Sequence, residues 1–192
     1  MQIRMLKIKK IIALTALMAA ALPVAAKSPP PAAPVVASQL RQQWAALRFE
    51  YFDTGAVLEL CRMFFSKSFT DQWVFDRFGP LDIDFNIVHY VKNRDPALTE
   101  IELEYWRYQP MDARRFMGMT LSFRDAVPVN LNQLRQIFGK VLEIPRLSPD
   151  GPFIYQFAMK DSQYRDSRVI LYTKKPIEYA DNFLTQINFR HE

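Results

Sequence analysis

Two short stretches decide how the fold of this chain is predicted: Thr70 to Gly79, TDQWVFDRFG, and Asn130 to Gly139, NLNQLRQIFG. Each begins with a residue that can cap a helix, carries an apolar residue five places before its glycine, and ends in one of the only two Phe-Gly pairs. A glycine directly after a helix favours a stop with positive φ, and Pro80 prevents the first helix from continuing. The sequence therefore predicts two short helices that end at Phe78 and Phe138.

Alternating polar and apolar residues follow both stretches. Residues 81–91 (LDIDFNIVHYV), 101–108 (IELEYWRY) and 115–123 (RFMGMTLSF) predict three strands after the first, and residues 153–159 (FIYQFAM) and 168–174 (RVILYTK) predict two after the second. A period of two is typical of a strand with one wet face. Gly118, inside the third strand, marks a bulge or a close approach.

Three further segments have helical character. Leu40, Trp44, Leu47 and Tyr51 recur at intervals of four, three and four, which predicts an amphipathic helix with Ser38 as its N-cap. Residues 56–65 (AVLELCRMFF) fit a helix slightly better than a strand. The final segment is expected to be helical from Pro176 to about residue 184, with a last strand as the alternative.

This order predicts an α+β domain with an antiparallel sheet of about five strands and helices packed on one face, because strands that adjoin in sequence are joined by short polar turns. A capped helix followed by strands occurs twice, so a tandem pseudo-repeat and a chance recurrence both remain open. The order resembles the helix-then-sheet architecture of the beta-lactamase inhibitor protein family and of small outer-membrane assembly proteins of similar fold. The chain lacks the disulfides of the former and the lipid attachment of the latter, so this resemblance assigns no residue roles.

The N-terminus has the pattern of a secretory signal peptide. Four basic residues precede the apolar run IIALTALMAAAL, and the small residues Val24-Ala25-Ala26 form a cleavage site after Pro23. We predict a signal peptide over residues 1–26 and export to the periplasm, with an uncleaved membrane anchor as the alternative. Residues 27–38 contain four prolines and no aromatic residue, which predicts a disordered linker ahead of one globular domain over residues 39–192.

The composition limits the classes of partner. The chain has 25 lysines and arginines against 20 acidic residues, and removal of the four basic residues of the signal leaves 21 against 20. A net charge of +1 gives no reason to expect a nucleic-acid partner, and we predict none. Cys61 is the only cysteine, so an intramolecular disulfide is impossible and the domain depends on its aromatic-rich core.

No catalytic or metal-binding signature stands out. Asp82, Asp84 and Asn86 begin like a calcium loop, but Ile87 stands where such a loop needs glycine and the required last glutamate is missing. Strand alternation explains these residues better. With only His89 and His191 present, a histidine-rich zinc site is excluded, and we predict neither a metal nor a cofactor. His89 shares the alternating face of Ile83, Phe85 and Ile87, so we expect a packed imidazole there.

The segment IELEYWRY gives the best candidate surface. If its apolar residues at 101, 103 and 105 face the core, the others point outward together: Glu102, Glu104, Trp106 and Tyr108. Trp and Tyr are enriched at binding hot spots, which favours a protein-binding face. The same pattern also fits a strand face covered by a helix or by the tail, or an exposed edge kept soluble by its charges.

We therefore expect an exported, non-enzymatic protein that binds another protein of the cell envelope, as an inhibitor, an immunity factor or an accessory of a complex. Two alternatives remain. One is an envelope hydrolase of cell-wall or sugar material that uses Glu102, Glu104 or Asp84, or Cys61 as nucleophile with His89 as base. The other is a carrier whose aromatic side chains line a cavity for an apolar ligand.

Overall fold

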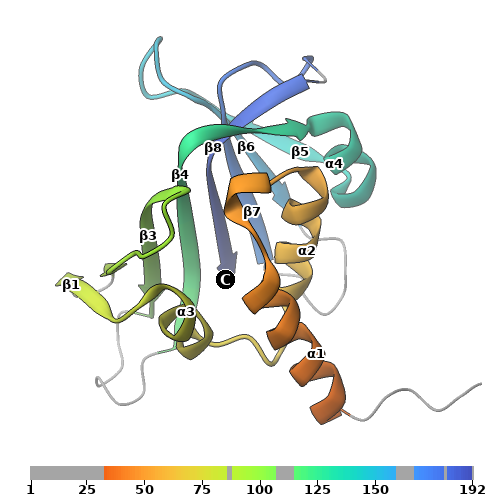
Figure 1. Ribbon diagram of the computed structural model, residues 1–192. Coiled ribbons are helices and arrows are strands. Elements are labelled where there is room, and N and C mark those ends of the chain that lie inside the picture. Colours follow the sequence, from red (N-terminus) through yellow and green to blue (C-terminus); the bar gives the residue numbers. More distant parts are fainter. Residues whose placement is uncertain (1–32, 86–87, 107–114, 159–166, 180, 192) are drawn as a thin grey trace, which may run out of the picture. The chain divides into compact units, whose positions relative to one another are not determined.

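The structure is a computed structural model that describes residues 33–85, 88–106, 115–158, 167–179 and 181–191 (Figure 1). The predicted signal peptide over residues 1–26 and the first half of the predicted linker, residues 27–32, lie outside the described residues, whereas residues 33–38 belong to the first helix. Helix α1, Ala33–Ala46, begins before the N-cap expected at Ser38. Pro34 lies in its first turn, where the N–H that proline lacks would have no helical partner.

Four further helical segments follow α1 along the chain. They are η1 (Phe49–Tyr51), α2 (Thr54–Phe64), α3 (Asp71–Phe78) and α4 (Leu131–Phe138). The helical interpretation of residues 56–65 is confirmed by α2, whose N-cap Asp53 accepts a hydrogen bond from the Ala56 N–H at 2.8 Å. Apolar burial along one face stabilises α2, since Val57, Leu60 and Phe64 are at most 1% exposed.

The two predicted helix ends are confirmed. Gly79 and Gly139 follow α3 and α4 with φ of 123° and 87°, a conformation that residues with a side chain rarely adopt. Asn130 caps α4 through its side chain, which accepts a hydrogen bond from the Gln133 N–H at 3.0 Å. Thr70 occupies the N-cap position of α3 but makes no side-chain cap hydrogen bond.

The sheet has eight strands, so the expected number of about five is wrong. The strands are β1 (Leu81–Phe85), β2 (Val88–Val91), β3 (Leu98–Tyr105), β4 (Phe116–Asn130), β5 (Val141–Ile144), β6 (Phe153–Ala158), β7 (Ser167–Thr173) and β8 (Asp181–His191). All seven neighbouring pairs are antiparallel, and the order across the sheet is β1-β2-β3-β4-β8-β7-β6-β5. The α+β class with an antiparallel sheet is thus confirmed.

The additional strands come from three segments. The predicted strand over residues 81–91 is replaced by two strands, β1 and β2, that pair antiparallel, and the four residues of β5 are too short to show alternation. The helix expected from Pro176 is wrong, because residues 181–191 form β8 and pair with both β4 and β7. Pairing on both sides satisfies its backbone hydrogen bonds, and this outweighs the helical start signal of the proline.

The helices cover one face of the sheet (Figure 1). Aromatic contacts record this packing: Phe64 of α2 contacts Phe189 of β8 at 5.3 Å, and Phe138 of α4 contacts Phe157 of β6 at 5.6 Å between ring centroids. Phe52, directly after η1, contacts Phe123 of β4 at 5.0 Å. The hydrophobic core therefore lies between the helices and this face, and the described helices leave the other face of the sheet open.

Candidate functional site

The open face is defined by the strand register. On β3, Ile101 and Leu103 point into the core and are fully buried, so Glu100, Glu102 and Glu104 lie on the open face. Glu102 stands opposite Tyr90 on β2 and Thr120 on β4, and the same row continues through Asn188 on β8. We call the following group of side chains the carboxylate face: Tyr90, Glu100, Glu102, Glu104, Tyr172 and Arg190.

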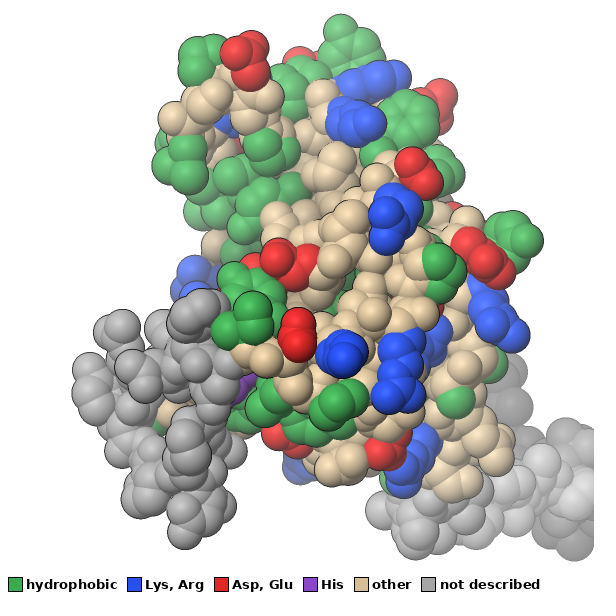
Figure 2. Space-filling view, turned by 60° about the vertical axis from the view of Figure 1, so that its left-hand side comes forward, with side chains coloured by type: hydrophobic (Ala, Val, Ile, Leu, Met, Phe, Trp, Pro, Cys, Tyr) green, Lys and Arg blue, Asp and Glu red, His purple; other side chains and the backbone are tan. Residues whose placement is uncertain are grey.

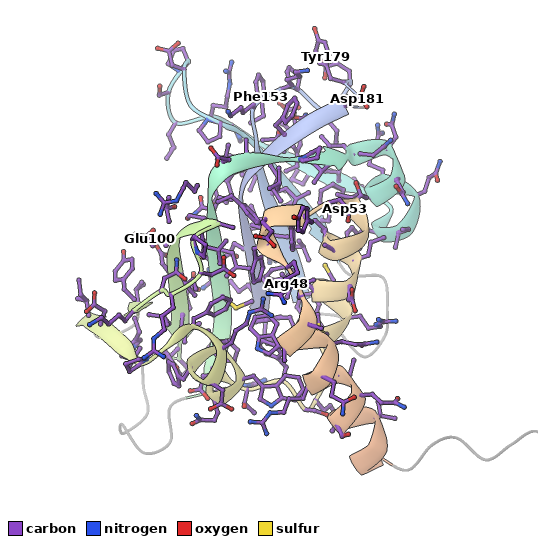
Figure 3. All side chains as sticks on the ribbon, viewed as in Figure 1. Arg48, Asp53, Glu100, Phe153, Tyr179 and Asp181 are labelled. Atoms are coloured by element: carbon purple, nitrogen blue, oxygen red, sulfur yellow. The ribbon has the colours of Figure 1, made fainter. Side chains whose placement is uncertain are left out.

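The candidate residues from the sequence fall partly on this face. Glu102 and Glu104 are half-buried on β3, and Trp106, directly after the strand, is 48% exposed. The Trp106 N–H donates to the Arg115 carbonyl at 2.9 Å, which holds its backbone beside the start of β4. Tyr108 lies outside the described residues. In Figure 3 the Glu100 side chain lies beside β3, well away from Tyr179 and Asp181 at the upper end.

Glu102 is electrostatically the most perturbed residue of the carboxylate face. Partial burial raises the pKa of its carboxyl, and a hydrogen bond with Glu100, the charge of Glu100 and the charge of Glu104 raise it further, to about 7. A hydrogen bond with Tyr90 acts in the opposite direction. Three carboxyl groups on alternate residues of one strand thus repel one another, and the central one retains its proton close to neutral pH.

Two tyrosines, one on β2 and one on β7, respond to the same negative charge. The charge of Glu102, followed by burial, raises the pKa of Tyr90 on β2. Burial, followed by the charges of Glu102 and Glu104, raises the pKa of Tyr172 on β7. Both phenols therefore stay protonated and keep an O–H donor near the carboxylates at physiological pH.

Glycine at position 118 lets Glu104 reach across β4. Gly118 stands between Glu104 on β3 and Arg190 on β8, and the Arg190 Nε lies 3.6 Å from the Glu104 Oε2. A Cβ at Gly118 would lie 3.4 Å from that carboxylate oxygen and 3.0 Å from the Phe189 carbonyl oxygen. The close approach expected at Gly118 is present, and a register shift follows between Glu104 and Tyr105.

A buried hydrogen bond lies beneath these charged groups. The Asn188 side-chain amide donates to the Thr120 hydroxyl at 2.8 Å, and both residues are less than 9% exposed. Because a buried amide is costly to leave unpaired, this bond fixes the relative positions of β4 and β8 at the centre of the carboxylate face.

The other two candidates from the sequence, Cys61 and His89, are both buried. Cys61 is 2% exposed, and burial raises the pKa of its thiol, which keeps the thiol protonated and unreactive. His89 is fully buried against the Tyr105 ring at 4.7 Å, as a packed imidazole. Its expected sharing of a face with Ile83 is wrong, because Ile83 pairs with Tyr90 and is 45% exposed. The break between β1 and β2 changes the alternation there.

Asp84, the third carboxylate considered for hydrolysis, pairs with His89 through the β1–β2 ladder. Within the part of the chain that the structure describes, no group of three or more His, Cys, Asp or Glu side chains is placed to hold a metal ion. Among the same residues, none of the helices has the length and apolar character needed to cross a membrane.

Charge and apolar surface are distributed differently over the molecule. On the side shown in Figure 2, basic and acidic side chains are interspersed, and hydrophobic side chains gather at the upper end. The two views differ by a rotation about the vertical axis, so the upper end in Figure 2 is the end where Figure 1 shows α4, β5 and the start of β8. Large exposed apolar side chains include Leu142 at 56% and Leu147 at 100%.

Four members of the carboxylate face were missed by sequence reasoning: Tyr90, Glu100, Tyr172 and Arg190. Glu100 was detectable, since it continues the outward alternation of Glu102 and Glu104 by one step. The others come from strands β2, β7 and β8, and their approach depends on a strand order that local patterns do not reveal.

Comparison with known proteins adds no assignment to this geometry. No protein-family model, no curated protein and no solved structure matches the chain.

Proposed function

We propose that the chain is an exported, non-enzymatic protein that binds another protein of the cell envelope through the carboxylate face. The observation that carries the proposal is the set of three neighbouring glutamates on a sheet face that the described helices leave open. Their excess negative charge is complementary to a partner that presents lysine or arginine side chains. We propose no catalytic residue for this face.

Aromatic side chains beside the glutamates support a protein partner. Trp106 is 48% exposed, and Tyr90 on β2 and Tyr172 on β7 are half-buried. Such side chains supply rigid contact area with a polar end, and they are enriched among the residues that dominate binding energies. Arg190, 3.6 Å from Glu104, already neutralises part of one carboxylate, so we expect Glu100 and Glu102 to receive the basic groups of the partner.

The protonation of Glu102 gives this proposal a distinctive pH dependence. A basic side chain near Glu102 favours the ionised carboxylate, whereas the free protein holds a proton there up to a pKa of about 7. Binding must therefore release this proton below pH 7, and affinity rises with pH between about 5 and 8. A partner that binds elsewhere on the chain would leave this dependence absent.

The experiment is capture of partners from envelope extract by the purified chain, compared among charge variants. Glu102→Lys combined with Glu104→Lys is expected to abolish capture of the specific partner, and Trp106→Ala to weaken it. Glu50→Lys, an exposed glutamate of η1 on the helical side, is the matched control and should capture normally. Equal capture by all these proteins would refute the carboxylate face as the binding site.

We also infer that the sheet consists of two tandem pseudo-repeats, each contributing half of the open face. Helix α3 is followed by β1 to β4 and α4 by β5 to β8, and both helices end in Phe-Gly with positive φ at the glycine. Pairing of β4 with β8 makes the strand order run outward in both directions from the centre. Superposition of residues 70–130 on residues 130–191 tests this inference, which fails if the four strands do not coincide in order and register.

A further inference from the structure

A pocket lies on the helical side of the sheet, opposite the carboxylate face, where three separate parts of the chain meet. Residues 65–69, between α2 and α3, form one wall. Arg115 and Phe116 at the start of β4 form another, and His191 at the end of β8 completes the lining. The pocket has a volume of about 240 Å³. The hydrogen bond from the Trp106 N–H to the Arg115 carbonyl fixes the backbone of the second wall.

The floor of this pocket is aromatic. Phe65 and Phe69 are less than 9% exposed, and Phe116 lies 6.3 Å from Phe69 in a stacked arrangement. Phe64, beneath the floor, stacks on the His191 ring at 5.0 Å with an angle of 18° between the planes. These contacts hold the His191 ring in place against an aromatic cluster at the base of the pocket.

The polar groups around this floor are basic or neutral. Lys67, Arg115 and His191 all line the pocket, and among the residues that the structure describes no acidic side chain lines it. Burial, together with the nearby charge of Arg115, lowers the pKa of His191, while a backbone hydrogen bond at Phe64 acts the other way. The described lining residues therefore give the pocket a positive local potential.

One residue that lines the pocket, Ser66, has a buried hydroxyl. The Ser66 hydroxyl is buried and has no hydrogen-bond partner among the residues that the structure describes. A buried polar atom without a partner is uncommon in a folded protein. The His191 Nδ1, by contrast, is engaged with the Ser167 hydroxyl at 3.3 Å, so the ring is oriented from behind.

We propose that this pocket binds a small monocarboxylate with an apolar body, its carboxylate held by Arg115 and Lys67 and its body lying on the phenylalanine floor. Arg115 can pair with a carboxylate through two parallel hydrogen bonds, and Lys67 adds a second positive charge. A small free acid such as hexanoate or benzoate can enter this pocket of about 240 Å³. This site is separate from the carboxylate face and does not rest on the function proposed for it.

The test is an NMR titration of the full chain, in which the His191 ring signals are followed as benzoate is added. The substitution His191→Gln assigns these signals, and His89, fully buried elsewhere, is the internal reference. Benzoate is expected to bind in the millimolar range, to shift the His191 signals and to raise the pKa of His191, because an anion beside an imidazole favours its charged form. Unchanged His191 signals at saturating benzoate would overturn the proposal.

Three probes separate the parts of the ligand. Benzamide keeps the ring but lacks the charge, and acetate keeps the charge but lacks the apolar body, so each should bind at least about tenfold more weakly than benzoate. Equal binding of benzamide would exclude the carboxylate role. N-acetylphenylalanine represents the carboxyl end of a peptide; tighter binding of this probe would overturn assignment of the site to a free acid.

Variants locate the binding. Arg115→Gln is expected to weaken benzoate about tenfold, since it removes a charge-assisted hydrogen bond. Arg62→Gln is the matched control, because Arg62 is an exposed arginine of α2 that pairs with Glu59 and does not line the pocket. Circular dichroism of both variants checks that they fold. Equal affinity of the Arg115→Gln variant and the Arg62→Gln control would refute the site.

Discussion

Replacement of Glu102 by glutamine tests the electrostatics of the carboxylate face directly. In the folded chain the Glu102 carboxyl has its pKa raised from 4.5 to about 7, chiefly by burial and by its neighbour Glu100. Between these two values the native state retains a proton that the unfolded chain has lost. Because the unfolded state binds fewer protons in this window, the free energy of unfolding falls as pH rises from about 4.5 to 7.

The magnitude follows from the shift and from the exposure of the group. A pKa unit corresponds to about 1.4 kcal/mol, so the full shift would give about 3 kcal/mol for a buried group. Glu102 is only half-buried, and water screens its repulsion from Glu100 and Glu104, which reduces the expected effect to about 1 kcal/mol. Glutamine keeps the neutral form at every pH and can still donate to the Glu100 carboxylate. The Glu102→Gln variant should therefore exceed the wild type in stability at pH 8 by about this amount.

The assay is urea unfolding followed by circular dichroism at several pH values between 5 and 8. The gain of the Glu102→Gln variant should be small at pH 5 and reach its full size at pH 8, where it corresponds to about 2 to 4 °C in thermal midpoint. Glu50→Gln, at an exposed position of η1, serves as the control and should show no such trend. A gain that stays constant across this pH range, or no gain at pH 8, would refute the electrostatic account of Glu102.

Three further predictions concern packing, capping and reactivity. Gly118→Ala places a Cβ 3.0 Å from the Phe189 carbonyl oxygen and should destabilise the fold by about 1 to 3 kcal/mol in the same urea assay; unchanged stability would show that β4 and β8 can separate there. Asn130→Ala removes the cap of α4 and should cost about 1 kcal/mol, whereas Asn130→Asp should retain most of it. Cys61 should react with a maleimide only after unfolding, because burial raises its thiol pKa; rapid labelling of native protein would contradict its placement in the core.

Local signals predicted the helices better than the strands. Gly79 and Gly139 adopt positive φ, a conformation that glycine reaches more easily than other residues. A glycine at the end of a helical pattern therefore marks the helix end locally, whatever the rest of the fold does. The strand β8 has no comparable local mark, because it is central and takes its stability from β4 and β7. Pro176 favoured a helix nearby, and only the partners of β8 decide against one.

The same distinction applies to the candidate site. Glu102, Glu104 and Trp106 were predicted from alternation along a single strand, which fixes the face of a side chain once its neighbours are buried. Arg190 and Tyr172 lie 86 and 70 positions beyond Glu104 and Glu102 in the sequence, so no local window contains both partners. The raised pKa of Glu102 also depends on burial by neighbouring strands, and the composition of the chain does not predict this burial.

The central position of β8 has a consequence for folding during synthesis of the chain. Strands β1 to β4 and strands β5 to β7 are joined in one sheet only through residues 181–191, which pair with β4 on one side and β7 on the other. While those residues are still inside the ribosome, β4 and β7 each lack β8, the strand with which both pair in the folded chain. The complete eight-stranded sheet can therefore form only after synthesis has passed this segment.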